Sequence, residues 1–237
     1  MSEIETGRWT LEGVEAGEAL SHLPGFEKVM VVLRNGGATH ERIGAVDTVK
    51  RGDDGLIALG QDVHTARIDP GQVCNVVLDT TSEMRGKVYP ALEFADADGE
   101  TLFSVIGMDG AAGFVAAFDG VPKGAAEGKR REMPSASEAP EDLSGDPGFA
   151  LLDQLRAAES DVTIRLSLSG RTQSWHGQIE TVRPAMGFAN VMTADFHLHL
   201  KAGAVETWRK DGGRHVALNS DGVEIGLVID TVEGQAA

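Results

Sequence analysis

The sequence predicts an α+β protein that consists mostly of antiparallel β-sheets, built from two internal structural repeats with flanking helices. Two observations predict this fold class. Short runs of β-branched and other apolar residues recur along the 237-residue chain and are separated by glycine, aspartate and asparagine, a pattern typical of strands joined by tight turns. These runs also occur in the same order in both halves of the chain, which indicates a duplication.

The first half is expected to consist mainly of strands. Its candidate strands are EKVMVVLR, GAVDTVKR, GLIALG, VHTARI and QVCNVVLD. Residues 91–107 predict a β-hairpin because two alternating runs meet at Asp98 and Gly99, a dipeptide that favours tight turns. Residues 109–120, DGAAGFVAAFDG, predict a short helix.

Residues 121–148 differ in composition from the rest of the chain. Small, charged, proline and glycine residues dominate this stretch, so it is expected to be a linker or a mobile loop. It divides the chain into a first β-rich repeat at residues 1–120 and a second β-rich repeat at residues 149–237.

The second half is expected to open with a helix at residues 149–161, FALLDQLRAAESD. Its apolar side chains share one helical stripe: Phe149, Leu151, Leu152, Leu155 and Ala158. Candidate strands then follow as VTIRLSLSG, WHGQIETVR, FANVM, FHLHL, AVETWRK, HVALN and VEIGLVID.

The strands of the two halves correspond at a nearly constant spacing. GAVDTVKR (44–51) matches GQIETVRP (177–184) at an offset of 133, and the same offset aligns His64 with His197. The hairpin turn at Asp98 matches Asp221 at an offset of 123. The offset shortens in one place, where TTSEMRGKVYP has no full counterpart. Because each half would be open on one sheet face, we expect the two halves to pack against each other.

The composition argues against several classes of partner. A net charge of −16 repels nucleic acid and anionic membranes, and an aromatic content of 5% disfavours a base-stacking surface. Neither a phosphate-binding glycine loop nor a nucleophile motif is present.

The cellular location is predicted from the single cysteine and the first residues. Cys74 has no disulfide partner and lies in an apolar run, so we expect a reducing compartment and a buried thiol. The acidic N-terminus lacks the apolar segment of a signal peptide. No apolar run approaches membrane-spanning length, so we expect a cytoplasmic protein without membrane insertion.

One candidate strand, FHLHLK at residues 196–201, carries two histidines with one leucine between them. Successive side chains of a strand point to opposite faces, so Phe196, Leu198 and Leu200 are expected on one face. His197 and His199 then share the other face, where they could bind a metal, contact a cofactor or meet water.

Several stretches resemble the HemS/ChuX family of bacterial haem-utilisation proteins. In the first half, the family's motif VMALTRN, followed by VHE and a glycine, is similar to VMVVLRNGGATHERIGAVDTV. In the second half, the family's motif FNLHLR with a following tryptophan is similar to ADFHLHLKAGAVETWRKDGG. The resemblance covers about 24–118 and 149–230. It implies curved antiparallel sheets with flanking helices, and a cytoplasmic protein that carries haem.

The sequence departs from this family at the expected iron ligand. The resemblance implies an axial histidine on a helix that leads into the second repeat, but the helix at residues 149–161 contains none. Three functions therefore remain open: a haem-binding and haem-trafficking protein, which we favour, a haem-degrading enzyme, or a structural or interaction protein that keeps the fold.

Haem binding needs an axial donor, an apolar slot and cations for the two propionates. The resemblance and the residue types together suggest these contacts: His40, Arg34, Arg42, Trp175, His176, His197, His199 and Lys201. His199 and His176 are the expected metal ligands, with Glu206 as a further candidate donor. Each of these side chains could instead be packed or hydrogen-bonded within a sheet. Since single-repeat relatives of the family form homodimers, we expect either a monomer that acts as a pseudo-dimer or a homodimer.

Overall fold

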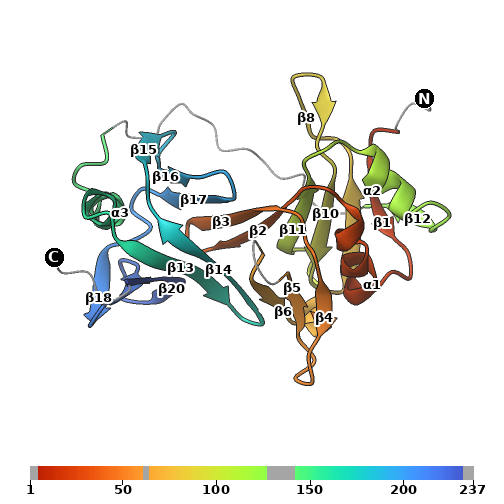
Figure 1. The fold of residues 1–237 in the computed structure, drawn as a ribbon. Helices are drawn as coiled ribbons and strands as arrows, with labels where there is room; N and C mark the ends of the chain where they lie inside the picture. Colours follow the sequence, from red (N-terminus) through yellow and green to blue (C-terminus); the bar gives the residue numbers. More distant parts are fainter. Residues whose placement is uncertain (1–4, 61–63, 127–141, 232–237) are drawn as a thin grey trace. The chain divides into compact units, whose positions relative to one another are not determined.

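The computed structural model describes residues 5–60, 64–126 and 142–231 (Figure 1). The chain forms two compact units. Unit 1 comprises Met1–Leu33 and Arg42–Arg130, and unit 2 comprises Arg34–Glu41 and Arg131–Ala237. The repeat boundaries predicted from the sequence stay a prediction; in the expected linker, residues 127–141 lie outside the described residues. No helix in the described part of the chain is long and apolar enough to cross a membrane.

Unit 1 consists of antiparallel strands with two short helices. Six strands lie in the order β12-β1-β7-β10-β11-β2, and three lie in the order β6-β5-β4. Their bounds are β1 (Arg8–Leu11), β2 (Val29–Asn35), β4 (Val49–Arg51), β5 (Ile57–Leu59), β6 (Ala66–Ile68), β7 (Asn75–Asp79), β10 (Ala91–Ala95), β11 (Thr101–Gly107) and β12 (Lys123–Ala125). The other described elements are α1 (Ala16–Ser21), α2 (Ala112–Ala117), the 3₁₀ helices η1 (Leu23–Gly25) and η2 (Pro70–Gln72), and a hairpin of β8 (Glu83–Met84) and β9 (Lys87–Val88). The chain passes into unit 2 within β2 and returns within β3 (Ala38–Gly44).

Unit 2 contains a helix, five strands in the order β18-β19-β20-β13-β14, and four in the order β3-β17-β16-β15. Their bounds are α3 (Pro147–Ala157), β13 (Asp161–Leu168), β14 (Arg171–Gln178), β15 (Val182–Ala185), β16 (Phe188–Met192), β17 (Phe196–Lys201), β18 (Thr207–Asp211), β19 (Arg214–Leu218) and β20 (Glu224–Thr231).

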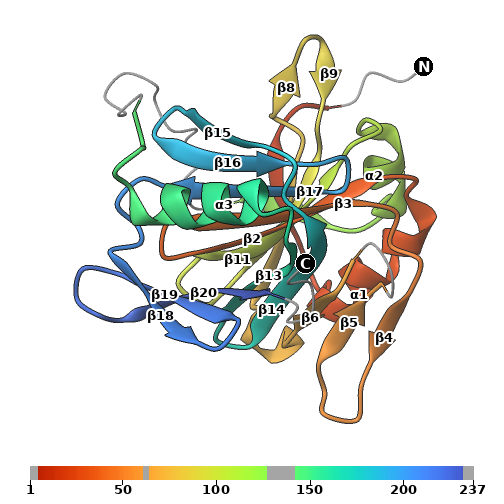
Figure 2. The same cartoon turned by 60° about the vertical axis from the view of Figure 1, so that its left-hand side comes forward.

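The helix α3 covers one face of the sheet that contains β17 (Figure 2). It starts two residues earlier than the sequence predicts because the Asp146 carboxylate caps it, accepting the Phe149 N–H at 2.9 Å. Gly148 lets the helix approach Leu200 closely, since a Cβ there would lie 2.6 Å from the Leu200 side chain. The leucine face of β17 is therefore buried under the helix, and the opposite face carries the histidines.

The element order confirms the two predicted repeats. A helix followed by eight strands occurs from α1 to β11, leaving out the β8–β9 hairpin, and again from α3 to β20. The strand order β7-β10-β11-β2 in unit 1 has the same arrangement as β18-β19-β20-β13 in unit 2. The β8–β9 hairpin lies in the TTSEMRGKVYP segment, where the sequence comparison expects extra residues in the first repeat.

The prediction that Cys74 is buried is wrong, because its thiol is exposed. Cys74 immediately precedes β7, and its backbone N–H donates to the Ala95 carbonyl at 2.8 Å. Only the residues from Val76 onward belong to the buried part of that apolar run.

The close approach of β20 to β13 requires a glycine at position 226. Gly226 has a φ of 78°, and a Cβ there would lie 1.9 Å from the Ser167 carbonyl oxygen. Gly222 has a φ of 72°, but a Cβ added at this position would meet no atom within 4 Å, so Gly222 is a matched control.

We expect Gly226→Ala to lower the free energy of unfolding by about 3 kcal/mol or more, because steric overlap adds to backbone strain. Gly222→Ala is expected to lower it by only about 1–2 kcal/mol, from backbone strain alone. Denaturant unfolding of both variants measures the difference. Equal losses would contradict this account of Gly226.

Candidate functional site

The two faces of β17 differ as the alternation in its sequence predicts. Phe196, Leu198 and Leu200 are buried. The side chains of His197 and His199 retain 21% and 29% of their accessible surface. Their ring centroids lie 5.9 Å apart at an interplanar angle of 70°, so the two imidazoles are close without stacking.

Glu41, which lies on the neighbouring strand β3, completes a group with these histidines. Its Oε2 is 3.3 Å from Nδ1 of His197 and 3.6 Å from Nε2 of His199. One potential ligand atom from each of the three side chains lies within 4.8 Å of the others. All three residues belong to unit 2. We call Glu41, His197 and His199 the carboxylate–imidazole group.

Asn190 on β16 fixes the orientation of His199. Its Nδ2 donates to the carbonyls of Arg183, Ala185 and Phe188 at 3.0–3.3 Å, so its Oδ1 faces His199 Nδ1 at 2.6 Å. Since an amide oxygen can only accept, Nδ1 of His199 donates the proton. The second ring nitrogen, Nε2, is thereby directed at Glu41.

The environment of Glu41 keeps its carboxylate ionised. Burial by itself would raise the pKa of Glu41, but hydrogen bonds from His197 and His199, together with their charges, lower it to about 2. A buried carboxylate between two imidazoles therefore carries a negative charge at every physiological pH.

The histidine and tryptophan suggested as haem contacts on β3 and β14 are buried. His40 has no exposed surface, its Nε2 lies 3.1 Å from the Ile164 carbonyl, and its Nδ1 accepts from the Gln173 amide at 2.9 Å. Trp175 stacks on Phe196 with ring centroids 4.6 Å apart. Both ring nitrogens of His40 thus have hydrogen-bond partners within the core of unit 2.

The remaining suggested residues are dispersed. His176 is exposed on β14, with its Nδ1 3.3 Å from the Thr163 hydroxyl, and it is not part of the carboxylate–imidazole group. Arg42 is buried in unit 1. Arg34 and Lys201 are brought together in unit 2, where both line one pocket.

This pocket has a volume of about 300 Å³. Phe188 and residues 35–39 line it beside the two cationic side chains. The Gly36–Gly37 turn shapes it, because both residues have positive φ values of 53° and 86° and Gly37 accepts the Lys201 N–H at 2.9 Å. Lys201 lies on the same face of β17 as His197 and His199, at alternate positions of the strand.

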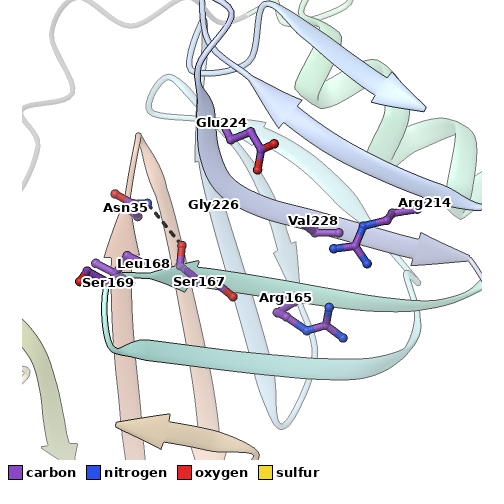
Figure 3. A pocket seen from close by; sticks show the side chains of 9 residues that line it. All are labelled: Asn35, Arg165, Ser167, Leu168, Ser169, Arg214, Glu224, Gly226 and Val228. Carbon is purple, nitrogen blue, oxygen red and sulfur yellow. Dashed lines mark hydrogen bonds between the residues drawn. The ribbon is translucent and has the colours of Figure 1, made fainter. Parts of the chain in front are cut away.

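A second pocket of about 610 Å³ lies against β13, β19 and β20 (Figure 3). Arg165 and Arg214 line it, and both are within 3.3–3.5 Å of the Asp230 carboxylate. None of the described residues that line this pocket is a histidine, so they offer cations without an axial donor for iron.

Sequence reasoning missed Glu41 and Asn190 as site residues. Glu41 is 156 residues from His197 along the chain, and only the pairing of β3 with β17 makes them neighbours. Alternation in ATHERIG could have placed Glu41 on the face opposite His40, but it does not identify the partner strand.

The lowered pKa of Glu41 predicts how the stability of the protein depends on pH. A carboxyl whose pKa falls from 4.5 to about 2 on folding stabilises the protein above pH 4.5, and this stabilisation is lost as the pH falls toward 2. The contribution is on the order of 3 kcal/mol. We expect the difference in unfolding free energy between the native protein and Glu41→Gln to shrink as the pH falls from 4.5 toward 2. Parallel curves down to pH 2.5 would contradict the assignment.

Comparison with known proteins identifies the family. The family model of the haemin-degrading HemS.ChuX domain matches residues 3–120, whereas no curated protein matches the sequence. Among solved structures, the heme degrading enzyme ChuS from Escherichia coli O157:H7 is similar with a TM-score of 0.72 and 16% identity, covering 98% of this chain and 83% of ChuS. Holo-PhuS, a heme-binding protein from Pseudomonas aeruginosa, is similar with a TM-score of 0.70 and 14% identity, covering 97% of this chain and 82% of PhuS. The chain has the fold of these proteins and, through the domain at residues 3–120, belongs to the HemS/ChuX family.

Proposed function

We propose that this protein binds haem and passes it on in the utilisation of haem iron. The match of residues 3–120 to the haemin-degrading HemS.ChuX domain carries the proposal. The similar structures include a heme degrading enzyme, ChuS, and a heme-binding protein, PhuS. Haem binding is the step that carriage and degradation share, so it is the function to test first.

The residues of unit 2 fit a haem group at the histidine face of β17. His197 donates from Nδ1 to the Glu41 carboxylate, and its Nε2 has no hydrogen-bond partner within the described part of the chain. A histidine that donates from one ring nitrogen to a carboxylate is held in place and offers the other nitrogen to a metal. His199 is less suitable, because both of its ring nitrogens face partners. We therefore assign His197 as the axial donor.

The same face offers apolar surface and cations near His197. Met192 pairs directly with His197 across β16 and β17 and is 52% exposed, and Phe188 pairs with Lys201. Lys201 follows His197 by four residues, or about 13 Å between α-carbons. Lys201 and Arg34 line the adjacent pocket, where they would hold the propionates. When bound, haem would supply the iron chemistry, and the protein would supply the imidazole, the cations and a partly shielded surface.

Titration with hemin tests the proposal and its axial donor. We expect a saturable Soret change at one equivalent in the native protein. His197→Ala should shift the Soret maximum or weaken binding at least about tenfold, because an iron ligand is lost. His176→Ala and His199→Ala test the other accessible imidazoles and should retain the native spectrum. Absence of saturable binding would overturn the proposal, and a loss confined to His176→Ala would move the axial donor to β14.

Carriage and degradation differ in the fate of the bound haem. For a carrier, the Soret band should persist when ascorbate and oxygen are added to the complex in the presence of catalase. Steady loss of the band under these conditions would contradict carriage and identify a haem-degrading enzyme.

The charge of Lys201 should affect hemin affinity through the propionates. We expect Lys201→Gln to weaken binding about three- to fivefold, in line with an exposed ion pair worth up to about 1 kcal/mol. Lys201→Glu should weaken it further. Lys210→Gln removes an exposed lysine of β18 as the matched control and should have no effect. Equal affinities of all three variants would exclude Lys201 from the site.

A further inference from the structure

We propose that Glu41, His197 and His199 form a binding site for one divalent transition-metal ion outside haem. The ligand atoms would be those that face one another, Oε2 of Glu41, Nδ1 of His197 and Nε2 of His199, all within unit 2. Binding of a free ion at this site differs from the proposed haem binding in its ligands. The free ion needs the Glu41 carboxylate as a direct ligand, whereas haem iron does not.

The distances between the three donors suit an ion between them. Bond lengths of about 2.0–2.1 Å place two ligands of a tetrahedral ion about 3.3–3.4 Å apart. The distances from Oε2 of Glu41 to the two histidine nitrogens are 3.3 and 3.6 Å. One potential ligand atom from each of the three residues lies within 4.8 Å of the others, and a small rotation of a partly exposed imidazole would bring the two histidine nitrogens to the distance that an ion requires.

The hydrogen bonds around His199 prepare its Nε2 for a cation. Asn190 holds the ring proton on Nδ1, so a neutral His199 points the lone pair of Nε2 at the Glu41 carboxylate. Two acceptors that face each other repel unless a cation lies between them. A proton fills this role when the imidazole is charged, and a divalent ion fills it when the imidazole is neutral. Outer-sphere partners such as Asn190 are typical of histidines that bind metals.

The donor set selects the class of ion. Two imidazole nitrogens and one carboxylate oxygen favour Zn²⁺, Fe²⁺, Co²⁺ or Ni²⁺, whereas Ca²⁺ and Mg²⁺ prefer sites made of oxygen. The carboxylate is buried, with 8% of its side-chain surface exposed, so it loses little orientational freedom on binding. The half-exposed imidazoles leave the solvent side of the ion for water or another ligand. The net charge of −16 further attracts cations to the protein.

Haem and the free ion should exclude each other because they need opposite tautomers of His197. Haem iron at Nε2 requires the proton on Nδ1, where it is donated to Glu41. An ion between the three side chains requires the lone pair of Nδ1 and hence the proton on Nε2. Glu41 therefore acts as an acceptor in the first case and as a ligand in the second.

Calorimetric titration with Zn²⁺ on the full, tag-free chain at pH 7.5 tests the site. We expect one equivalent to bind saturably and to raise the thermal unfolding temperature. Glu41→Gln and His199→Ala should each weaken Zn²⁺ binding by more than about 100-fold, which exceeds the loss typical of outer-sphere partners. Because Glu41 is buried and His199 is half-exposed, His199→Ala also keeps the test valid if Glu41→Gln does not fold.

Two control variants and the absorption spectrum of bound Co²⁺ show whether the loss of Zn²⁺ binding is specific to the proposed ligands. Glu180→Gln changes an exposed carboxylate of unit 2, and His176→Ala removes the other histidine that the sequence suggests as a metal ligand; neither should change Zn²⁺ affinity. Co²⁺ should give visible d–d absorption bands that disappear in His199→Ala. The inference is overturned if the native protein shows no saturable Zn²⁺ binding, or if Glu41→Gln and His199→Ala bind Zn²⁺ as tightly as the native chain.

Hemin titration of His199→Ala, which should retain the native hemin spectrum, separates this inference from the proposed haem function. Retained Soret binding with lost Zn²⁺ binding supports a distinct ion site. Failure of the native protein to bind hemin while it still binds Zn²⁺ would overturn the haem function alone.

Discussion

The pairing of β3 with β17 is the constraint on which the chemistry of unit 2 depends. It places the carboxylate of Glu41 within 3.3–3.6 Å of two imidazoles that lie 156 and more residues away in the sequence. A shift of one residue between these strands would turn His40 toward the histidine face and bury Glu41 in the core. The pairing register of β3 and β17 therefore decides whether the ionised carboxylate of Glu41 lies on the same face as the two histidines.

Several neighbouring features hold this register. The Gly36–Gly37 turn starts β3, and Gly37 accepts the backbone N–H of Lys201. His40 fills the opposite face of β3 and is hydrogen-bonded at both ring nitrogens to β13 and β14. Trp175 stacks on Phe196 beneath β17. His40 and Trp175, which the sequence suggested as haem contacts, thus pack within unit 2, whereas His197 and His199 lie on the other face of the sheet.

Local patterns in the sequence predicted the fold well and the site only in part. Alternation in FHLHLK correctly separated the leucines from the histidines, and the shifted offset near TTSEMRGKVYP located the extra β8–β9 hairpin. Burial of Cys74 was predicted wrongly because an apolar run does not reveal where its strand begins. Glu41 and Asn190 were missed because their roles arise from strand pairing, which residue spacing does not encode.

The position of the proton on each of the two imidazole rings is the most direct test of the arrangement of Glu41, His197 and His199. Long-range ¹H–¹⁵N correlation spectra of the metal-free protein with labelled histidine, at a pH where the rings are neutral, resolve which nitrogen carries each proton. We expect protonated Nδ1 in both rings, with the His197 proton donated to Glu41 and the His199 proton donated to Asn190. Protonated Nε2 in both rings, or rings that average freely between tautomers, would contradict this expectation.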